Sequence, residues 1–204
     1  IINHPRGGTN YFDVAGYDPL TGSVDNPAMW DDSFTAVEVF NDSGWQSNRD
    51  GLVEDWLSFL NHGRRVFAVG SSDSHHLRNS PVGYPRTCLM LGTDTPSETN
   101  PNAVRDAMAT GRSTISGGIY VFTTVGDAGP GMEATDQGAV ATVAVSVYAA
   151  SWVDVDTLEF LVDGETQHTV SIRPEDASMD EPTLRYQAEF TAPVSESGSY
   201  VIAA

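Results

Sequence analysis

The sequence predicts an α/β region followed by a small antiparallel β-sandwich. Short apolar runs alternate with helical patterns up to about residue 112, which is typical of strand–helix–strand units. Beyond residue 118 the pattern is one of strands and turns, with no further convincing helix. The change lies within residues 112–118, so we divide the chain into an α/β domain at 1–115 and a β-sandwich domain at 116–204.

The first region contains two predicted helices among short strands. Residues 35–40 and 66–70 read as buried strands. Between them lies a helix that ends at Gly63 and whose apolar face is formed by Leu52, Val53, Trp56, Leu57, Phe59 and Leu60. After the apolar run 88–91, a second helix begins at Asn100-Pro101, because proline in the first turn lacks only an N–H that has no helical partner there. Gly111 ends this helix.

The second region reads as an antiparallel sandwich. Residues 140–147 place valine at alternate positions, which is typical of a strand with one buried face. The runs 158–162 and 166–172 are separated by Asp163-Gly164, a strong signal for a β-hairpin. Residues 186–191 and 200–202 add further strand, so we expect a sandwich without a helix longer than two turns.

The composition excludes several classes of partner. The net charge is −18, and all ten basic residues are arginine. Such a surface repels phosphate backbones and anionic lipid, so we expect neither nucleic acid nor a membrane as partner. No run approaches the roughly 20 apolar residues of a membrane-spanning helix. The acidic surface and the sandwich favour a periplasmic or extracellular location, and any anion must be bound by specific arginines.

The segment 70–76, Gly-Ser-Ser-Asp-Ser-His-His, follows directly from a predicted strand. In an extended backbone Asp73 and His75 project to the same side, where a carboxylate and an imidazole can share a divalent metal. Active sites of α/β folds collect at the C-terminal ends of strands. His4 is a further candidate ligand, since Pro5 favours an extended conformation and Ile1-Ile2 suggests another strand end. The alternative for His4 is a solvated, frayed terminus.

Three other charged residues lie near these segments. Glu38 sits in a predicted apolar strand, so its carboxylate must either face the site or find a hydrogen-bonding partner such as Asn41 or a loop. Arg86 and Arg6 are suited to bidentate capture of a phosphate or carboxylate, or else to salt bridges within an acidic protein.

The remaining histidines and the cysteine suggest structural roles. His62 near a helix end and His168 in a sandwich strand are expected on the surface. Cys88, the only cysteine, lies in an apolar run and reads as an inert thiol.

Read together, several segments occur in a recognisable order. They are Ile2-Asn3-His4-Pro5, Val37-Glu38-Val39-Phe40-Asn41, residues 69–75, Gly83-Tyr84-Pro85-Arg86-Thr87 and residues 107–112. The series resembles the PHP (polymerase and histidinol phosphatase) superfamily, in particular its CehA/McbA-type metallohydrolases, over roughly residues 1–118. This resemblance implies the C-terminal portion of a distorted (β/α)7 PHP barrel that holds up to three divalent metal ions (zinc, manganese or iron). It implies that His4 is the late barrel ligand and that Asp73 and His75 are the last two ligands.

The function implied by the resemblance is metal-dependent hydrolysis of a small, anionic substrate, a phosphoester, ester or carbamate, by metal-activated water. Arg86 and Glu38 are then the candidate catalytic residues. The family's opening ligands have no counterpart here and are expected upstream of Ile1, so we expect weak metal binding and low activity from this chain. The alternative is a non-catalytic extracellular binding or spacer role built on the sandwich.

Overall fold

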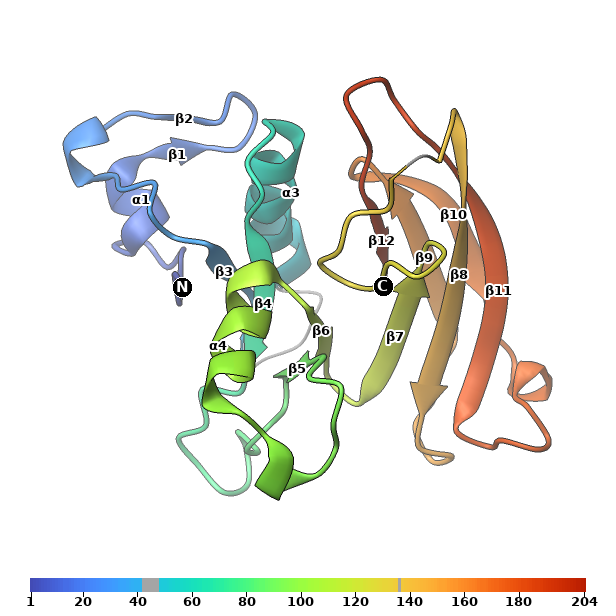
Figure 1. Cartoon of the computed structure of the whole chain (residues 1–204). Coiled ribbons are helices and arrows are strands. Elements are labelled where there is room, and N and C mark those ends of the chain that lie inside the picture. Colours follow the sequence, from blue (N-terminus) through green and yellow to red (C-terminus); the bar gives the residue numbers. More distant parts are fainter. Residues whose placement is uncertain (42–47, 136) are drawn as a thin grey trace. The chain divides into compact units, whose positions relative to one another are not determined.

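The computed structural model describes residues 1–41, 48–135 and 137–204 (Figure 1). The chain divides into two compact units, Ile1–Ile115 and Ser116–Ala204. The first mixes helices and strands and the second is built of antiparallel strands, so the fold is α/β followed by all-β. Among the described residues, no helix is both long enough and apolar enough to cross a membrane.

A parallel strand pair forms the centre of the first unit. Strand β3 (Ala36–Asn41) pairs with β4 (Phe67–Ser71), and Ile2 adds a parallel bridge to Val37 on the other side of β3. The connection carries a π-helical turn, η2 (Arg49–Val53), and helix α3 (Glu54–Asn61). The predicted strand–helix–strand unit is therefore confirmed. Residues 36–40 are all buried, as expected of a strand that has neighbours on both sides.

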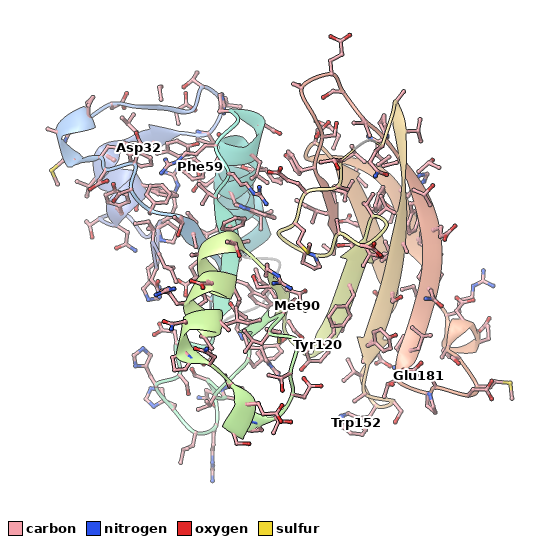
Figure 2. All side chains as sticks on the ribbon, viewed as in Figure 1. Asp32, Phe59, Met90, Tyr120, Trp152 and Glu181 are labelled. Carbon is pink, nitrogen blue, oxygen red and sulfur yellow. The ribbon has the colours of Figure 1, made fainter. Side chains whose placement is uncertain are left out.

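Aromatic side chains fill the core on one side of this pair. They come from α1 (Tyr11–Ala15), β1 (Tyr17–Asp18), the segment around η1 (Pro27–Met29), and α3, whereas β2 (Ser23–Val24) pairs with β1. Phe12 is fully buried, and its ring lies 5.7 Å from that of Phe59. Figure 2 shows Phe59 among the side chains of this core. Full burial of a side chain of this size contributes about 1.5–3 kcal/mol of stability.

The rest of the first unit contains β5 (Arg86–Leu89), η3 (Pro96–Glu98), α4 (Pro101–Thr110) and β6 (Ser113–Ser116). The Asn100 side chain accepts a hydrogen bond of 2.8 Å from the backbone N–H of Asn102, and Gly111 ends α4 with φ 68°. A Cβ at Gly111 would lie 1.9 Å from the Phe67 ring, so only glycine fits there. The helix predicted between Asn100 and Gly111 is confirmed.

The strands of the first unit do not close into a barrel within the described residues. They form three two-stranded sheets, β1–β2, β3–β4 and β5–β6.

The second unit is a sandwich of two three-stranded antiparallel sheets, ordered β11-β8-β7 and β10-β9-β12. Its strands are β7 (Ile119–Thr124), β8 (Val140–Ala149), β9 (Thr157–Val162), β10 (Glu165–Ser171), β11 (Leu184–Pro193) and β12 (Val201–Ala203). The rings of Phe160 on β9 and Phe190 on β11 stack at 4.8 Å, which joins the two sheets. In residues 116–135 and 137–204 the helical structure is the single turn η4 (Pro174–Asp176), as predicted.

Two details of the sandwich follow from the sequence pattern. Along β8 the alternate residues Ala141, Val143, Val145, Val147 and Ala149 are buried. The Asp163-Gly164 turn has φ of 51° and 83°, the left-handed pair of a tight hairpin, and joins β9 to β10 as predicted. Trp152, at 85% exposure, lies in the turn region that follows β8 (Figure 2).

Candidate metal centre

His4 stands at the end of the short segment that pairs with β3. Its backbone N–H donates a hydrogen bond of 2.8 Å to Oε2 of Glu38, and its ring Nδ1 lies 3.5 Å from the same oxygen. The φ angle of His4 is 47°, in the left-handed region, so the expectation of an extended conformation before Pro5 was wrong. A non-glycine residue at positive φ carries a strain of roughly 1–3 kcal/mol that its surroundings must offset. The hydrogen bond to Glu38 is one contribution that holds His4 in place.

Glu38 is fully buried on β3 and connects two segments of the site. Oε2 accepts from His4, and Oε1 accepts a hydrogen bond from the hydroxyl of Ser71, the last residue of β4. Both partners differ from Asn41, which the sequence suggested as one possibility. The carboxylate therefore lies at the junction of the His4 segment with the end of β4.

Asp73 is the residue on which the two histidines converge. Its Oδ1 lies 3.1 Å from Nε2 of His75, and its Oδ2 lies 3.6 Å from Nε2 of His4. The φ angle of Asp73 is 41°, so the segment turns after β4 and does not continue as the extended backbone that the alternation argument assumed. Asp73 therefore lies near each of the two histidines, and two of these three residues, His4 and Asp73, have left-handed backbones.

A serine that sequence reasoning missed supports this turn. Ser80 is buried, its carbonyl accepts a hydrogen bond from the hydroxyl of Ser74, and its own hydroxyl lies 3.4 Å from both the Asp73 carbonyl and the His75 N–H. The loop from 73 to 80 is thus closed on itself next to the candidate ligands. Serine is too common in turns for its type alone to have indicated this role.

Arg86 begins β5, which lies beside the end of β4. The hydroxyl of the next residue, Thr87, exchanges hydrogen bonds with both backbone groups of Gly70, at 2.9 and 2.8 Å. This places the backbone of Arg86 close to the strand end from which Asp73 follows. Burial raises the pKa of the Cys88 thiol, and the charge of Arg86 opposes this only in part, which agrees with the expected inert thiol.

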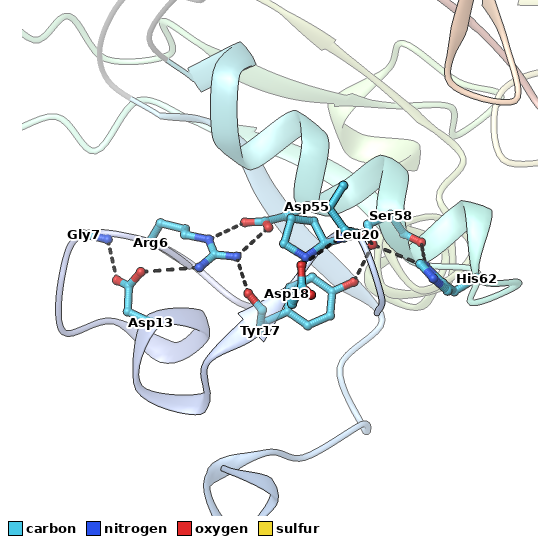
Figure 3. Close-up of polar contacts among 10 residues, drawn as sticks. Arg6, Gly7, Asp13, Tyr17, Asp18, Leu20, Asp55, Ser58 and His62 are labelled. Carbon is cyan, nitrogen blue, oxygen red and sulfur yellow. Dashed lines mark hydrogen bonds and ion pairs between the residues drawn. The ribbon is translucent and has the colours of Figure 1, made fainter. Parts of the chain in front are cut away.

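Arg6 forms a structural ion pair, the second of the two roles considered for it (Figure 3). Its Nε and Nη2 each donate a hydrogen bond of 2.7 Å to Asp55, and Nη2 also donates to the carbonyl of Tyr17 at 2.9 Å. The hydrogen bond to Asp55 raises the pKa of Arg6, while burial raises that of Asp55 more than Arg6 lowers it. An open acidic cleft lined by Arg6, Asp18, Asp55 and neighbouring residues adjoins this pair.

His62 and His168 are exposed, as predicted. His62 follows α3, where its Nδ1 lies 2.8 Å from the Ser58 carbonyl (Figure 3). His168 lies on β10 with its ring 5.4 Å from that of Phe190.

His4, Asp73 and His75 are donors of the kind that a divalent metal takes, and Asp73 lies near each histidine. Two ligands on one ion with bonds near 2.1 Å are separated by about 3.4 Å in tetrahedral geometry, and the two nitrogen–oxygen distances here are 3.1 and 3.6 Å. Within residues 1–41, 48–135 and 137–204, no group of three or more His, Cys, Asp or Glu side chains is placed so that it could hold a metal ion. Comparison of the chain with protein-family models, curated proteins and solved structures finds no match.

Proposed function

We propose that this chain is a metal-dependent hydrolase of the PHP type, with His4, Asp73 and His75 as its metal ligands. The observation that supports this most directly is the contact of two imidazole Nε2 atoms with the two different oxygens of Asp73. His4 and Asp73 are also the two ligands at positive φ, and backbone strain of this kind concentrates at functional sites. The proposal includes the fold that the resemblance implies, the C-terminal portion of a PHP barrel.

The chemistry that a divalent metal supplies in such a site is a lowered pKa of coordinated water and polarisation of the substrate oxygen. The residues of this chain would hold the metal ion and orient it. Asp73 carries the negative charge that favours a cation, and the histidines contribute neutral nitrogen donors. Arg86 is proposed to neutralise charge on a small anionic substrate, a phosphoester, ester or carbamate.

The test is a titration of the 204-residue chain with Zn²⁺ and with Mn²⁺ by isothermal calorimetry. Because the family's opening ligands are expected upstream of this chain, we expect weak one-to-one binding. Asp73→Ala and His75→Ala should each weaken it by more than the roughly 10–100-fold typical of losing an outer partner. His76→Ala is the matched control, since His76 is the exposed histidine next in the chain, and it should bind as the parent does. Binding that is equal in all four proteins would refute the assigned ligands.

Activity is tested with bis(p-nitrophenyl) phosphate and p-nitrophenyl acetate in the presence of the tighter-binding metal. We expect slow turnover from this chain, and the loss of that turnover in Asp73→Ala would support the hydrolase. Arg86→Ala should raise KM for the phosphodiester while leaving the neutral acetate unaffected. Turnover that persists in Asp73→Ala would contradict the proposed chemistry.

A further inference from the structure

The carboxylate of Glu38 contacts both segments that carry the proposed ligands. One oxygen accepts from the backbone N–H of His4, and the other accepts from the hydroxyl of Ser71, two residues before Asp73. These contacts span 34 and 33 residues of sequence. A single buried side chain therefore joins the His4 segment to the segment that leads into Asp73.

Burial of this carboxylate is costly unless its oxygens are satisfied. The side chain of Glu38 is 0% exposed, and its neighbours on β3 are the apolar Val37 and Val39. A carboxylate in such surroundings needs hydrogen-bond donors on both oxygens, and the two donors it has come from the two halves of the site. An apolar side chain would be less costly to bury at this position of the strand. We therefore attribute the presence of a carboxylate here to its hydrogen bonds with His4 and Ser71.

The orientation of His4 follows from the same contacts. Oε2 of Glu38 faces Nδ1 of the ring at 3.5 Å, while Nε2 on the opposite side faces Asp73. A carboxylate beside Nδ1 favours the tautomer that carries its proton there, which leaves the lone pair of Nε2 directed away. The backbone hydrogen bond to the same oxygen holds the left-handed conformation that points the ring this way.

We propose that Glu38 is a positioning residue that sets the backbone conformation and the tautomer of His4 and fixes its distance from Asp73. This inference rests on the proposed function, because positioning His4 matters only if His4 binds a metal ion. Glu38 acts through His4 and Ser71, so its removal should change ligand geometry while the fold of the unit remains.

The first measurement needs no metal. In ¹⁵N-labelled chain at pH 8, long-range ¹H–¹⁵N spectra distinguish a proton on Nδ1 from one on Nε2 of His4. We expect the Nδ1-protonated form in the parent chain and a shift toward the Nε2-protonated form in Glu38→Ala. Glu38→Gln keeps an acceptor for His4, so it should lie nearer the parent. Asp106→Asn, which removes an exposed carboxylate on α4 of the same unit, is the control and should leave the His4 signals unchanged.

The second measurement is Zn²⁺ affinity by calorimetry in the same four proteins. Glu38→Ala should weaken binding by roughly 10–100-fold, with Glu38→Gln intermediate and Asp106→Asn close to the parent. If Glu38→Ala fails to fold by circular dichroism, Ser71→Ala removes the second contact alone and should weaken binding in the same direction. An unchanged tautomer and unchanged affinity in the folded variants would overturn the positioning role. A parent chain that shows the predicted tautomer but binds no Zn²⁺ would refute the metal site and leave the Glu38–His4 contact established.

Discussion

Replacement of Asp55 by asparagine should destabilise the first unit substantially. The Asp55 side chain is 2% exposed and receives two hydrogen bonds of 2.7 Å from Arg6. Breaking a buried ion pair by removing one partner costs about 3–5 kcal/mol when the remaining charge is stranded. Here the Arg6 side chain keeps 30% exposure and its hydrogen bond to Tyr17, so part of that charge stays solvated. We therefore expect a loss of about 2–3 kcal/mol for Asp55→Asn.

The assay is urea unfolding followed by tryptophan fluorescence. Trp30, Trp45 and Trp56 belong to the first unit and Trp152 to the second, so fluorescence reports chiefly on the first. The midpoint for this signal should fall in Asp55→Asn, while a far-ultraviolet dichroism transition of the sandwich should not move.

The double variant Arg6→Met/Asp55→Leu distinguishes the cost of leaving Arg6 without its partner from the cost of changing the side chain at position 55. Removing both charges together is often nearly neutral, so this variant should lie within about 1 kcal/mol of the parent. A loss below 0.5 kcal/mol (roughly the scatter of surface substitutions) in Asp55→Asn would refute the reasoning. So would a double variant less stable than Asp55→Asn.

Three further predictions concern packing and protonation. Phe160→Ala, which removes a fully buried ring stacked on Phe190, should destabilise the sandwich by about 3–5 kcal/mol in urea unfolding monitored by circular dichroism; a change under 1 kcal/mol would contradict the packing. The raised pKa of Cys88 should make iodoacetamide alkylation at pH 8 slower than in a urea-unfolded sample, and equal rates would be inconsistent with the half-buried thiol. Burial opposes ionisation of Asp13, yet backbone N–H groups and Arg6 hold its pKa below the ordinary value. The stability from this carboxylate is present above about pH 4 and is lost as the pH falls through the folded pKa, so Asp13→Asn should lose less stability than the parent on acidification.

Local sequence signals predicted much of the fold. The hairpin at Asp163-Gly164 and the helix between Asn100 and Gly111 depend on residues adjacent in sequence, whose backbone preferences are strong. Alternating valines predicted β8 for the same reason, because burial on one face requires a period of two.

The geometry of the site could not be predicted in this way. It depends on the pairing of Ile2 with Val37 and on the contacts of Glu38 with His4 and Ser71, which join residues more than 30 positions apart. The left-handed conformation of His4 opposes its local preference before proline, so tertiary contacts must hold it. The sequence therefore indicated which residues to consider. The long-range contacts that bring them near one another could be seen only in the structure.

Because β8 is the central strand of its sheet, insertions and deletions cannot be tolerated within it. β8 pairs with β11 on one side and with β7 on the other, and both ladders share its alternation of buried and exposed residues. Insertion of one residue into the middle of β8 would turn every side chain beyond it to the opposite face and expose valines that form the core. Insertions and deletions in related chains should therefore be confined to the turns between strands, and β8 should keep a constant length.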